Sequence, residues 1–442
     1  MEGACCLMDP VFGDPFEEGI VISCPRREVF PARLPAVDTL IVSHRHPDHF
    51  DIPSLAQVNR DCDAICPADP LIVYALKALG FERVHPVYPM GPILSQDFEL
   101  YPTRSEIRSI PECGMVFKDR TGVFWNQVDT SLSPETIAAI RARFGTLDLL
   151  FAMYASQNFD FFESRSTEFP FETHRENLDN VLRIHPRVAV PSSAGFRFCE
   201  PHEWLNAFLF PISRERFVAD LEQLEPGIHT CLLNPGDIVE VSNGKAKVHS
   251  GASEAARTIE QDTARLDFDP TAAVPELVDP NPEGYPDEHL SRVVGRLIRQ
   301  DMASYCQGGD DRALSLYRQH HARYAVAVVF PNGRVHSTCF AFEPDTVEVS
   351  SDPAACQAAD VVHRIAASAL VGWIERKKSF FYVRAYSRRF NTLYQLSHDS
   401  ERVELKPRPL PDLLMHYVLN CSEGSELFAK QQVELQLAAL KA

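Results

Sequence analysis

Two periodicities alternate along the first half of the chain. Short apolar runs of strand length are separated by longer stretches in which apolar residues recur with a helical period. This alternation predicts an α/β fold with buried strands. The runs expected as strands are 20–24, 38–43, 147–153 and 187–191, and the stretches expected as helices are 52–59, 70–79, 134–144 and 174–184.

The composition changes between residues 246 and 285, where proline and acidic residues become frequent. Such a composition is typical of a linker or of a segment draped over a surface. The chain has 442 residues, which is beyond the size at which a single core keeps growing, so two domains are expected. We predict a first domain over 1–245, a linker over 246–285 and a smaller αβ domain over 286–442.

The second domain combines helical and strand patterns. Residues 288–305 and 311–321 have helical periodicity, and RYAVAVVF and VHSTCFAF are expected as strands joined by a PNG turn. Residues 360–390 predict an apolar helix followed by an aromatic and basic strand. This pattern is loosely similar to that of sterol-carrier-like domains, which pack helices over a curved sheet around an apolar cavity. The basic residues predict either a solvated strand edge or a site for an anionic substrate or an electron-donor protein. They are Lys377, Lys378, Arg384, Arg388 and Arg389.

Residues 40–50, LIVSHRHPDHF, contain a cluster of possible metal ligands, because three histidines and an aspartate directly follow an apolar run. His44 and His46 are two residues apart, so they point to one side of the chain and would bind one metal ion. Asp48 and His49 would reach a second ion. Imidazole and carboxylate ligands together suit zinc, iron or manganese. The alternative is a histidine-rich surface turn.

This motif resembles that of the metallo-β-lactamase-fold superfamily, an αββα sandwich whose metals lie at strand ends between two sheets. The resemblance implies that fold for the first domain, followed by a second, smaller αβ domain. VFWNQVDTS (123–131) is similar to the superfamily's second landmark, and by this likeness Asp129 would bridge the two ions. Asp129 could instead cap the helix that follows, a role that is open also to Ser131 or Ser133.

One departure from the superfamily concerns the ligand before the bridging aspartate. Its hydrolases usually place a histidine there, whereas residues 101–117 contain none. Glu106, with Glu112 as the alternative, is then the ligand that the resemblance implies, unless the glutamate is simply a solvated loop residue. A carboxylate in place of imidazole favours iron over zinc. The exchange is what we expect of the superfamily's oxygenase branch, which includes diiron hydroxylases of antibiotic biosynthesis.

A second departure concerns the last ligand position, where Ser192 and Ser193 stand in place of the usual histidine. The surrounding sequence resembles the metallo-β-lactamase-like region of the CMP-N-acetylneuraminate hydroxylase family, which makes His202 the candidate ligand. A structural histidine at the start of a helix is the alternative. Residues 151–162, FAMYASQNFDFF, would wall the site, with Tyr154 and Asn158 as polar groups near the substrate. Ordinary core packing is the alternative for this segment.

Charge and composition narrow the possible partners. Lysine and arginine number 43 against 61 acidic residues, and the net charge of −18 argues against nucleic acid or an anionic membrane as the main partner. No apolar run is long enough to span a bilayer, and the first residues lack a basic and apolar leader, so a cytoplasmic location is expected. The twelve cysteines are scattered and are expected to be buried thiols.

The motifs and the resemblance together predict a diiron monooxygenase that uses dioxygen as co-substrate on a small molecule. Electrons would come from a separate ferredoxin or flavin reductase, because the chain has no cysteine cluster with iron–sulfur spacing and no dinucleotide motif. The first alternative is a dizinc hydrolase of a lactone, phosphodiester or amide, in which Asp48 would orient the water. The second is a metal-dependent carrier or scaffold. The expected metal ligands are His44, His46, Asp48, His49, Glu106, Asp129 and His202, and the groups expected near the reaction are Asp48, Tyr154 and Asn158.

Overall fold

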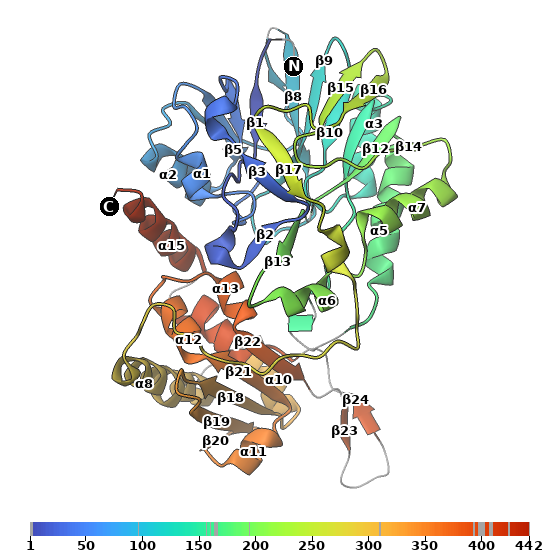
Figure 1. Cartoon of the computed structure of the whole chain (residues 1–442). Helices are drawn as coiled ribbons and strands as arrows, with labels where there is room; N and C mark the ends of the chain where they lie inside the picture. Colours follow the sequence, from blue (N-terminus) through green and yellow to red (C-terminus); the bar gives the residue numbers. More distant parts are fainter. Residues whose placement is uncertain are drawn as a thin grey trace. The chain divides into compact units, whose positions relative to one another are not determined.

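The computed structural model of the chain separates into two compact units (Figure 1). Unit 1 comprises Met1–Asn158, Phe169–Ala272 and Gln436–Ala442, and unit 2 comprises Phe159–Glu168 and Ala273–Leu435. The structure describes residues 3–95, 97–155, 157–159, 161–162, 167–193, 195–308, 311–391, 394–396, 403–405, 410–422 and 425–441.

The first sheet of unit 1 has four strands, and every neighbouring pair in it is parallel. Parallel strands need crossover connections. Helix α2 begins after the N-cap Asp69 and packs on two of the strands. The strand order is β1 (Cys6–Met8), β4 (Thr39–Ile41), β5 (Asp63–Pro67) and β6 (Val84–Val87), and the helices are α1 (Ile52–Leu55) and α2 (Pro70–Ala78).

The second sheet of unit 1 has seven strands. It is antiparallel from β7 to β10 and parallel from β10 to β14. Its order is β14 (His229–Thr230), β12 (Val188–Ser192), β11 (Leu149–Met153), β10 (Val123–Asn126), β9 (Cys113–Asp119), β8 (Phe98–Arg104) and β7 (Ile93–Leu94). The helices that pack with this sheet are α3 (Pro134–Phe144), α5 (Phe171–Ile184) and α7 (Arg214–Leu224).

The inner faces of the two sheets pack against each other. Ile41 and Ile65 of the first sheet share a buried cluster with Leu100 and Met115 of the second. With helices against both sheets, unit 1 is the expected αββα sandwich. The strands expected at 38–43, 147–153 and 187–191 and the helices expected at 70–79 and 134–144 are confirmed.

The segment expected as a linker contains regular structure at its start. Strand β17 (Ala256–Glu260) pairs with β3 (Arg26–Val29), so the chain is still part of unit 1 at that point. The irregular stretch begins only after residue 266, where the prolines become frequent. The other short elements of unit 1 are η1 (Glu17–Gly19), β2 (Val21–Ser23), η2 (Pro31–Arg33), β13 (Phe196–Phe198), η3 (Glu203–Leu205), α6 (Asn206–Leu209), β15 (Ile238–Ser242), β16 (Lys245–His249) and η4 (Thr263–Leu266).

Unit 2 is built on a five-stranded sheet in the order β20 (Val347–Ser350), β19 (Val335–Phe342), β18 (Arg323–Val329), β21 (Val361–Ala366) and β22 (Ser387–Asn391). The hairpin of β18 and β19 around the PNG turn is confirmed. The remaining elements are α8 (Asp287–Arg296), η5 (Leu297–Met302), α9 (Ala303–Gly308), α10 (Arg312–Gln319), α11 (Pro353–Gln357), α12 (Ala367–Ile374), α13 (Phe380–Ala385), β23 (Tyr394–Leu396), β24 (Val403–Leu405), α14 (Leu413–His416) and η6 (Tyr417–Ser422). The last helix, α15 (Ser425–Ala439), belongs to unit 2 up to Leu435 and to unit 1 from Gln436.

The structure corrects the expectation for residues 360–390. The run that starts at Val361 alternates between buried and half-buried positions, which is the period of a strand, and it forms β21 before helix α12 begins. The expected aromatic strand begins instead as helix α13, because the Ser379 side chain accepts a hydrogen bond from the Tyr382 N–H and caps it. Among the described residues, no helix is both long and apolar enough to cross a membrane.

Candidate metal centre

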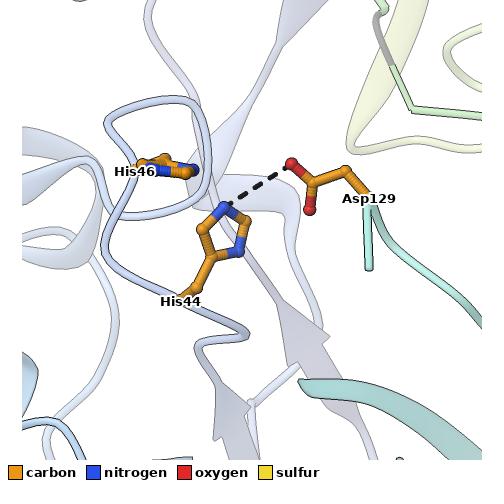
Figure 2. Close-up of side chains that lie close together, drawn as sticks. All are labelled: His44, His46 and Asp129. Atoms are coloured by element: carbon orange, nitrogen blue, oxygen red, sulfur yellow. Dashed lines mark ion pairs between the residues drawn. The ribbon is translucent and has the colours of Figure 1, made fainter. Parts of the chain in front are cut away.

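The H-x-H-x-D-H motif lies in the loop that leaves the buried strand β4. Figure 2 shows that His44 and His46 from this loop point toward Asp129, which follows β10 in the other sheet. Ligand atoms of these three residues lie within 4.8 Å of one another. His44 is fully buried and His46 is exposed, so the group lies at the surface end of the sandwich.

A chain of hydrogen bonds orients His44. The Ser43 hydroxyl donates to Asp9 Oδ2 over 2.7 Å, so His44 Nδ1, 2.9 Å from the same hydroxyl oxygen, must be the donor in that contact. The Nε2 atom of His44 then carries the lone pair and lies 3.6 Å from Asp129 Oδ2. A carboxylate that holds a histidine through its second nitrogen is the usual support of a metal-binding imidazole.

Asp9 also orients His49. His49 Nδ1 lies 3.0 Å from Asp9 Oδ2, and its Nε2 faces Asp48 Oδ2 at 3.6 Å and Asp129 Oδ2 at 3.8 Å. These last distances are too long for hydrogen bonds but match ligands of one ion, since bonds of about 2.0–2.2 Å from a shared metal place its ligands roughly 3–4 Å apart. The geometry thus suits a metal ion at His44, His46 and Asp129, with Asp48 and His49 beside it.

A strained turn places Asp129. The preceding residue, Val128, has a φ of 60°, which is unfavourable for a β-branched residue, and it is buried. The Val128 N–H donates to the Asn126 side chain, and the Thr130 hydroxyl donates to the Gln127 carbonyl, so the turn is held on both sides. The cap of the following helix α3 is Ser133, whose hydroxyl accepts from the Thr136 N–H. Asp129 is therefore not needed as the helix cap.

The pKa shifts of the motif's histidines and two unpartnered polar atoms are compatible with bound cations. Burial, reinforced by the charge of His49, lowers the pKa of His44 to about 4, and burial also lowers the pKa of His46. Burial acts to lower the pKa of His49 too, but Asp48, Asp9 and Asp129 outweigh it and raise that pKa to about 10. Two buried atoms, His44 Nε2 and Asp129 Oδ1, have no hydrogen-bond partner among the described residues. Since such atoms are costly to bury, their presence fits a site built for metal ions.

Of the two glutamates considered as ligands, Glu112 is the buried one. Glu112 directly precedes β9 and is 6% exposed, and the next residue donates its N–H to the Ser43 carbonyl over 3.2 Å. Burial, with a smaller contribution from the charge of Asp129, raises the pKa of Glu112 to about 7, although the hydrogen bond from Ser105 acts to lower it. The side chain of Glu106 is exposed instead, and its N–H donates to the Ser131 carbonyl. Glu112 is therefore the glutamate that is buried next to the backbone of Ser43 and the motif.

The turn that carries Asp129 packs closely against Gly114, where a larger side chain would not fit. A Cβ atom at Gly114 would lie 2.7 Å from Thr103 Oγ1, 2.9 Å from the Asn126 carbonyl oxygen and 3.0 Å from the Gln127 carbonyl oxygen. Both carbonyls belong to the turn that carries Asp129.

We expect Gly114→Ala to displace the turn, to cost about 1–3 kcal/mol of stability and to lower metal content. Urea unfolding and elemental analysis would measure both effects. Gly91→Ala is the matched control, because the nearest atom to a Cβ there is 3.6 Å away. A Gly114→Ala protein with the stability and metal content of the parent would show that the turn tolerates displacement.

The structure does not place the remaining predicted site residues, His202, Tyr154 and Asn158, with the close ligand atoms. His202 is buried just before η3. The group of close ligand atoms among the described residues contains His44, His46 and Asp129, and not His202, Asp48, His49, Glu106 or Glu112. Tyr154 belongs to the core of the seven-stranded sheet, and its ring lies 6.1 Å from that of Phe217. The Asn158 backbone N–H donates to the Leu209 carbonyl, and its side-chain amide donates to the Phe208 carbonyl. These contacts give Tyr154 and Asn158 structural roles.

Two acidic residues near the site were not expected. Asp9 directly follows β1, the parallel neighbour of β4. An aspartate at the end of a strand could have been predicted from the sequence as a residue of the site. Glu17 has a buried Oε2 atom without a hydrogen-bond partner among the described residues. Burial raises the pKa of Glu17, and the nearby charge of Asp48 raises it further. No pattern in the sequence points to Glu17, which lies in a short 3-10 turn with a φ of 47°.

No family model matches the sequence, and no curated protein matches it. Solved structures do match part of the chain. CmlA, a diiron beta-hydroxylase from Streptomyces venezuelae, is 15% identical with a TM-score of 0.38, and the match covers 52% of this chain and 50% of that one. A possible metal-dependent hydrolase from Veillonella parvula is 13% identical with a TM-score of 0.38, covering 53% of this chain and 91% of that one.

The metallo-beta-lactamase fold protein YhfI from Bacillus subtilis is 13% identical with a TM-score of 0.32, and the match covers 49% of this chain and 80% of that one. The chain spans about half the length of CmlA. At such identities the likeness concerns the fold alone. Unit 1 itself is an αββα sandwich, and the solved structures to which the chain is similar include a diiron beta-hydroxylase and a possible metal-dependent hydrolase.

Proposed function

We propose that unit 1 holds two iron ions and oxygenates a small-molecule substrate. The observation that carries this proposal is Glu112, a buried carboxylate directly before Cys113, whose N–H donates to the carbonyl of Ser43, the neighbour of His44. An additional carboxylate makes the site harder and more anionic, which favours iron in its oxidised states over zinc.

Each ion has its own set of ligands, and Asp129 belongs to both. The first ion would take the two histidines that lie two residues apart, together with a glutamate, and the second would take the remaining aspartate and histidine of the motif. Glu17 and His202 are the candidates to complete the second set, Glu17 because its buried Oε2 lies near the charges of Asp48 and His49. The proposed first set is His44, His46, Glu112 and Asp129, and the proposed second set is Asp48, His49 and Asp129.

The protein's own residues hold this arrangement before any ion binds. Asp9 fixes both His44, through Ser43, and His49, so one carboxylate sets the orientation of a ligand for each ion. Two reduced iron ions would supply the activation of dioxygen. Transfer of one oxygen atom to the substrate and release of the other as water consume two electrons and two protons.

Those electrons require a donor protein, as expected from the sequence, but the structure does not support the basic stretch of unit 2 as its docking surface. Lys377 lies 2.8 Å from Glu375, Lys378 lies 2.8 Å from Glu283, and Arg389 is buried. Because Lys377 and Lys378 are paired within unit 2 and Arg389 is buried, this stretch is not part of the proposed docking surface.

A dizinc hydrolase is the alternative that the motif also supports, because Asp48 lies 3.6 Å from His49 Nε2 and could orient a water bound between two zinc ions. Dioxygen uptake separates the two functions. The iron-loaded full chain, given a chemical reductant, is expected to consume dioxygen faster than zinc-loaded protein or reductant alone. Iron-loaded protein that takes up no dioxygen while zinc-loaded protein hydrolyses a lactone or phosphodiester would establish the alternative.

A further inference from the structure

The two faces of the seven-stranded sheet are packed differently. Trp125 and Leu150, which share a core with helices α3 and α5, are fully buried. Phe117, Phe124 and Phe151 point to the opposite face, toward the first sheet, and are only half-buried. Neighbouring residues of a strand point to opposite faces, so the same strands are closely packed on one face and incompletely packed on the other.

The incompletely packed face borders a cavity of about 570 Å³ that lies wholly within unit 1. The three phenylalanines line it from the seven-stranded sheet, and Cys6 and Met8 line it from β1. Because β1 is the edge strand, the first sheet ends there, and the hairpin of β15 and β16 contributes Val239 and Val241 beyond it. Small-molecule sites in proteins have volumes of about 300–1,000 Å³.

The hairpin that borders the cavity is held at both ends. Just before β15, a Cβ atom at Gly236 would lie 2.6 Å from a carbonyl oxygen of β17, so the backbones touch there. At the other end, a Cβ atom at Gly122 would lie 2.7 Å from Val241 Cγ1, and the Asn243 N–H donates to the Thr121 carbonyl over 2.9 Å. Collapse of the hairpin onto the phenylalanines would break these contacts, so the fold itself keeps the space open.

The polar groups of the lining determine the charge of a ligand. Two carboxylates line the cavity, and both already accept hydrogen bonds from the protein. Asp119 accepts from the Thr121 hydroxyl over 2.6 Å, and Asp237 accepts from the N–H groups of Asn234 and Gly251 over 2.8 and 2.7 Å. Among the described residues that line the cavity, none is a lysine, an arginine or a histidine. An anion would therefore meet two carboxylates and no counter-charge.

The apolar groups of the lining favour an aromatic ligand. The rings of Phe117 and Phe124 are stacked with their centroids 5.4 Å apart, and the ring of Phe151 stands edge-on to that of Phe124 at 4.7 Å. Offset and edge-on contacts between rings are favourable, and so are contacts of rings with sulfur atoms such as those of Cys6 and Met8. At roughly 30 Å³ per water-sized group, the cavity has room for on the order of twenty non-hydrogen atoms.

We propose that this cavity binds a neutral aromatic molecule of several rings, held between the phenylalanines of the seven-stranded sheet and the edge strand β1. Among the described residues that line the cavity, none is a proposed metal ligand. The inference therefore does not depend on the function proposed for unit 1.

Fluorescence titration of the full chain with N-phenyl-1-naphthylamine, a neutral aromatic probe of suitable size, tests this site. The matched probe is 1-anilinonaphthalene-8-sulfonate, which carries a sulfonate on the same ring system. We expect the neutral probe to bind and the sulfonate to bind at least about tenfold more weakly, because a desolvated anion finds no partner in this lining.

A variant that fills the cavity locates the binding. Cys6→Trp should weaken binding of the neutral probe about tenfold or more, because the indole ring would occupy the space that the probe needs. Cys5→Trp is the matched control, since Cys5 is also half-buried but does not line the cavity, and it should bind as the parent does.

A second pair of variants keeps the test decisive if Cys6→Trp does not fold. Val239→Trp also fills the cavity, and its control is Ile238→Trp, because Ile238 is the exposed neighbour of Val239 on β15. Thermal unfolding would verify that each variant is folded. The proposal is wrong if the neutral probe does not bind, if the sulfonate binds as tightly, or if the folded filling variants keep the parent affinity.

Discussion

Replacing Asp129 by alanine is expected to empty both metal positions and to abolish turnover. Asp129 Oδ2 lies 3.6 Å from His44 Nε2 and 3.8 Å from His49 Nε2, so the same carboxylate serves a ligand of each ion. Its removal would leave two cations without their shared counter-charge. Loss of a supporting residue beyond the ligands costs about 10–100-fold in affinity, and loss of a bridging ligand should cost more.

Elemental analysis of the purified variant, grown with iron available, measures this effect. Asp267→Ala is the control, because Asp267 is an exposed aspartate of the same unit. The control should keep the metal content of the parent. If Asp129→Ala keeps both ions, Asp129 does not bridge them, and the turn at Val128 must serve another purpose.

Replacing Glu112 by histidine is expected to shift the metal preference from iron toward zinc and to stop dioxygen uptake. The change restores an imidazole at the position where hydrolases of the fold are expected to carry one, and it removes an anionic ligand. It also removes the carboxylate that accepts a hydrogen bond from the Ser105 hydroxyl, so some loss of stability should accompany the shift.

Glu106→His separates the two glutamates. Glu106 is exposed, so its replacement should leave the iron content and the rate of dioxygen uptake as they are. Growth with equal iron and zinc, followed by elemental analysis, gives the selectivity of each variant. An iron preference that changes with Glu106 and not with Glu112 would assign the ligand role to Glu106.

The sequence predicts the residues of the centre that lie close together in the chain. His44, His46, Asp48 and His49 occupy six positions after an apolar strand, so local geometry alone directs them to one place. The alternation of strands and helices follows for a similar reason, since the apolar periods of the longer elements are clear. The αββα architecture was implied by the resemblance of the motif. Asp129 was accessible only through the resemblance of its segment to a known landmark.

The residues that the sequence could not rank are those whose role depends on contacts between distant segments. Glu106 and Glu112 are both loop glutamates, and only burial against the motif distinguishes them. Glu17 reaches the charges of Asp48 and His49 through a short turn with unusual backbone angles, which no period or spacing signals. Tyr154 was predicted to lie near the substrate, but it packs in a hydrophobic core. The sequence could not separate these two roles, because an aromatic ring suits both a substrate pocket and a core.

Unit 2 illustrates the same limit. A strand at Val361 and a helix at Phe380 are both short and apolar, and periodicity cannot separate short apolar helices from strands. His363 and Arg389 both lie close to the carboxylate of Asp412, at 2.8 Å and 3.4 Å. Their positions depend on the pairing of β21 with β22 and on the role of Asp412 as the cap of α14, and neither could be predicted from the sequence.

The identity and number of the bound metal ions test the central proposal most directly. Full-length protein grown with iron enriched in a Mössbauer-active isotope should contain about two iron ions per chain. Its Mössbauer spectrum should show a coupled pair in the oxidised state. Stoichiometric zinc after growth with abundant iron, or iron that behaves as isolated single ions, would contradict the diiron assignment.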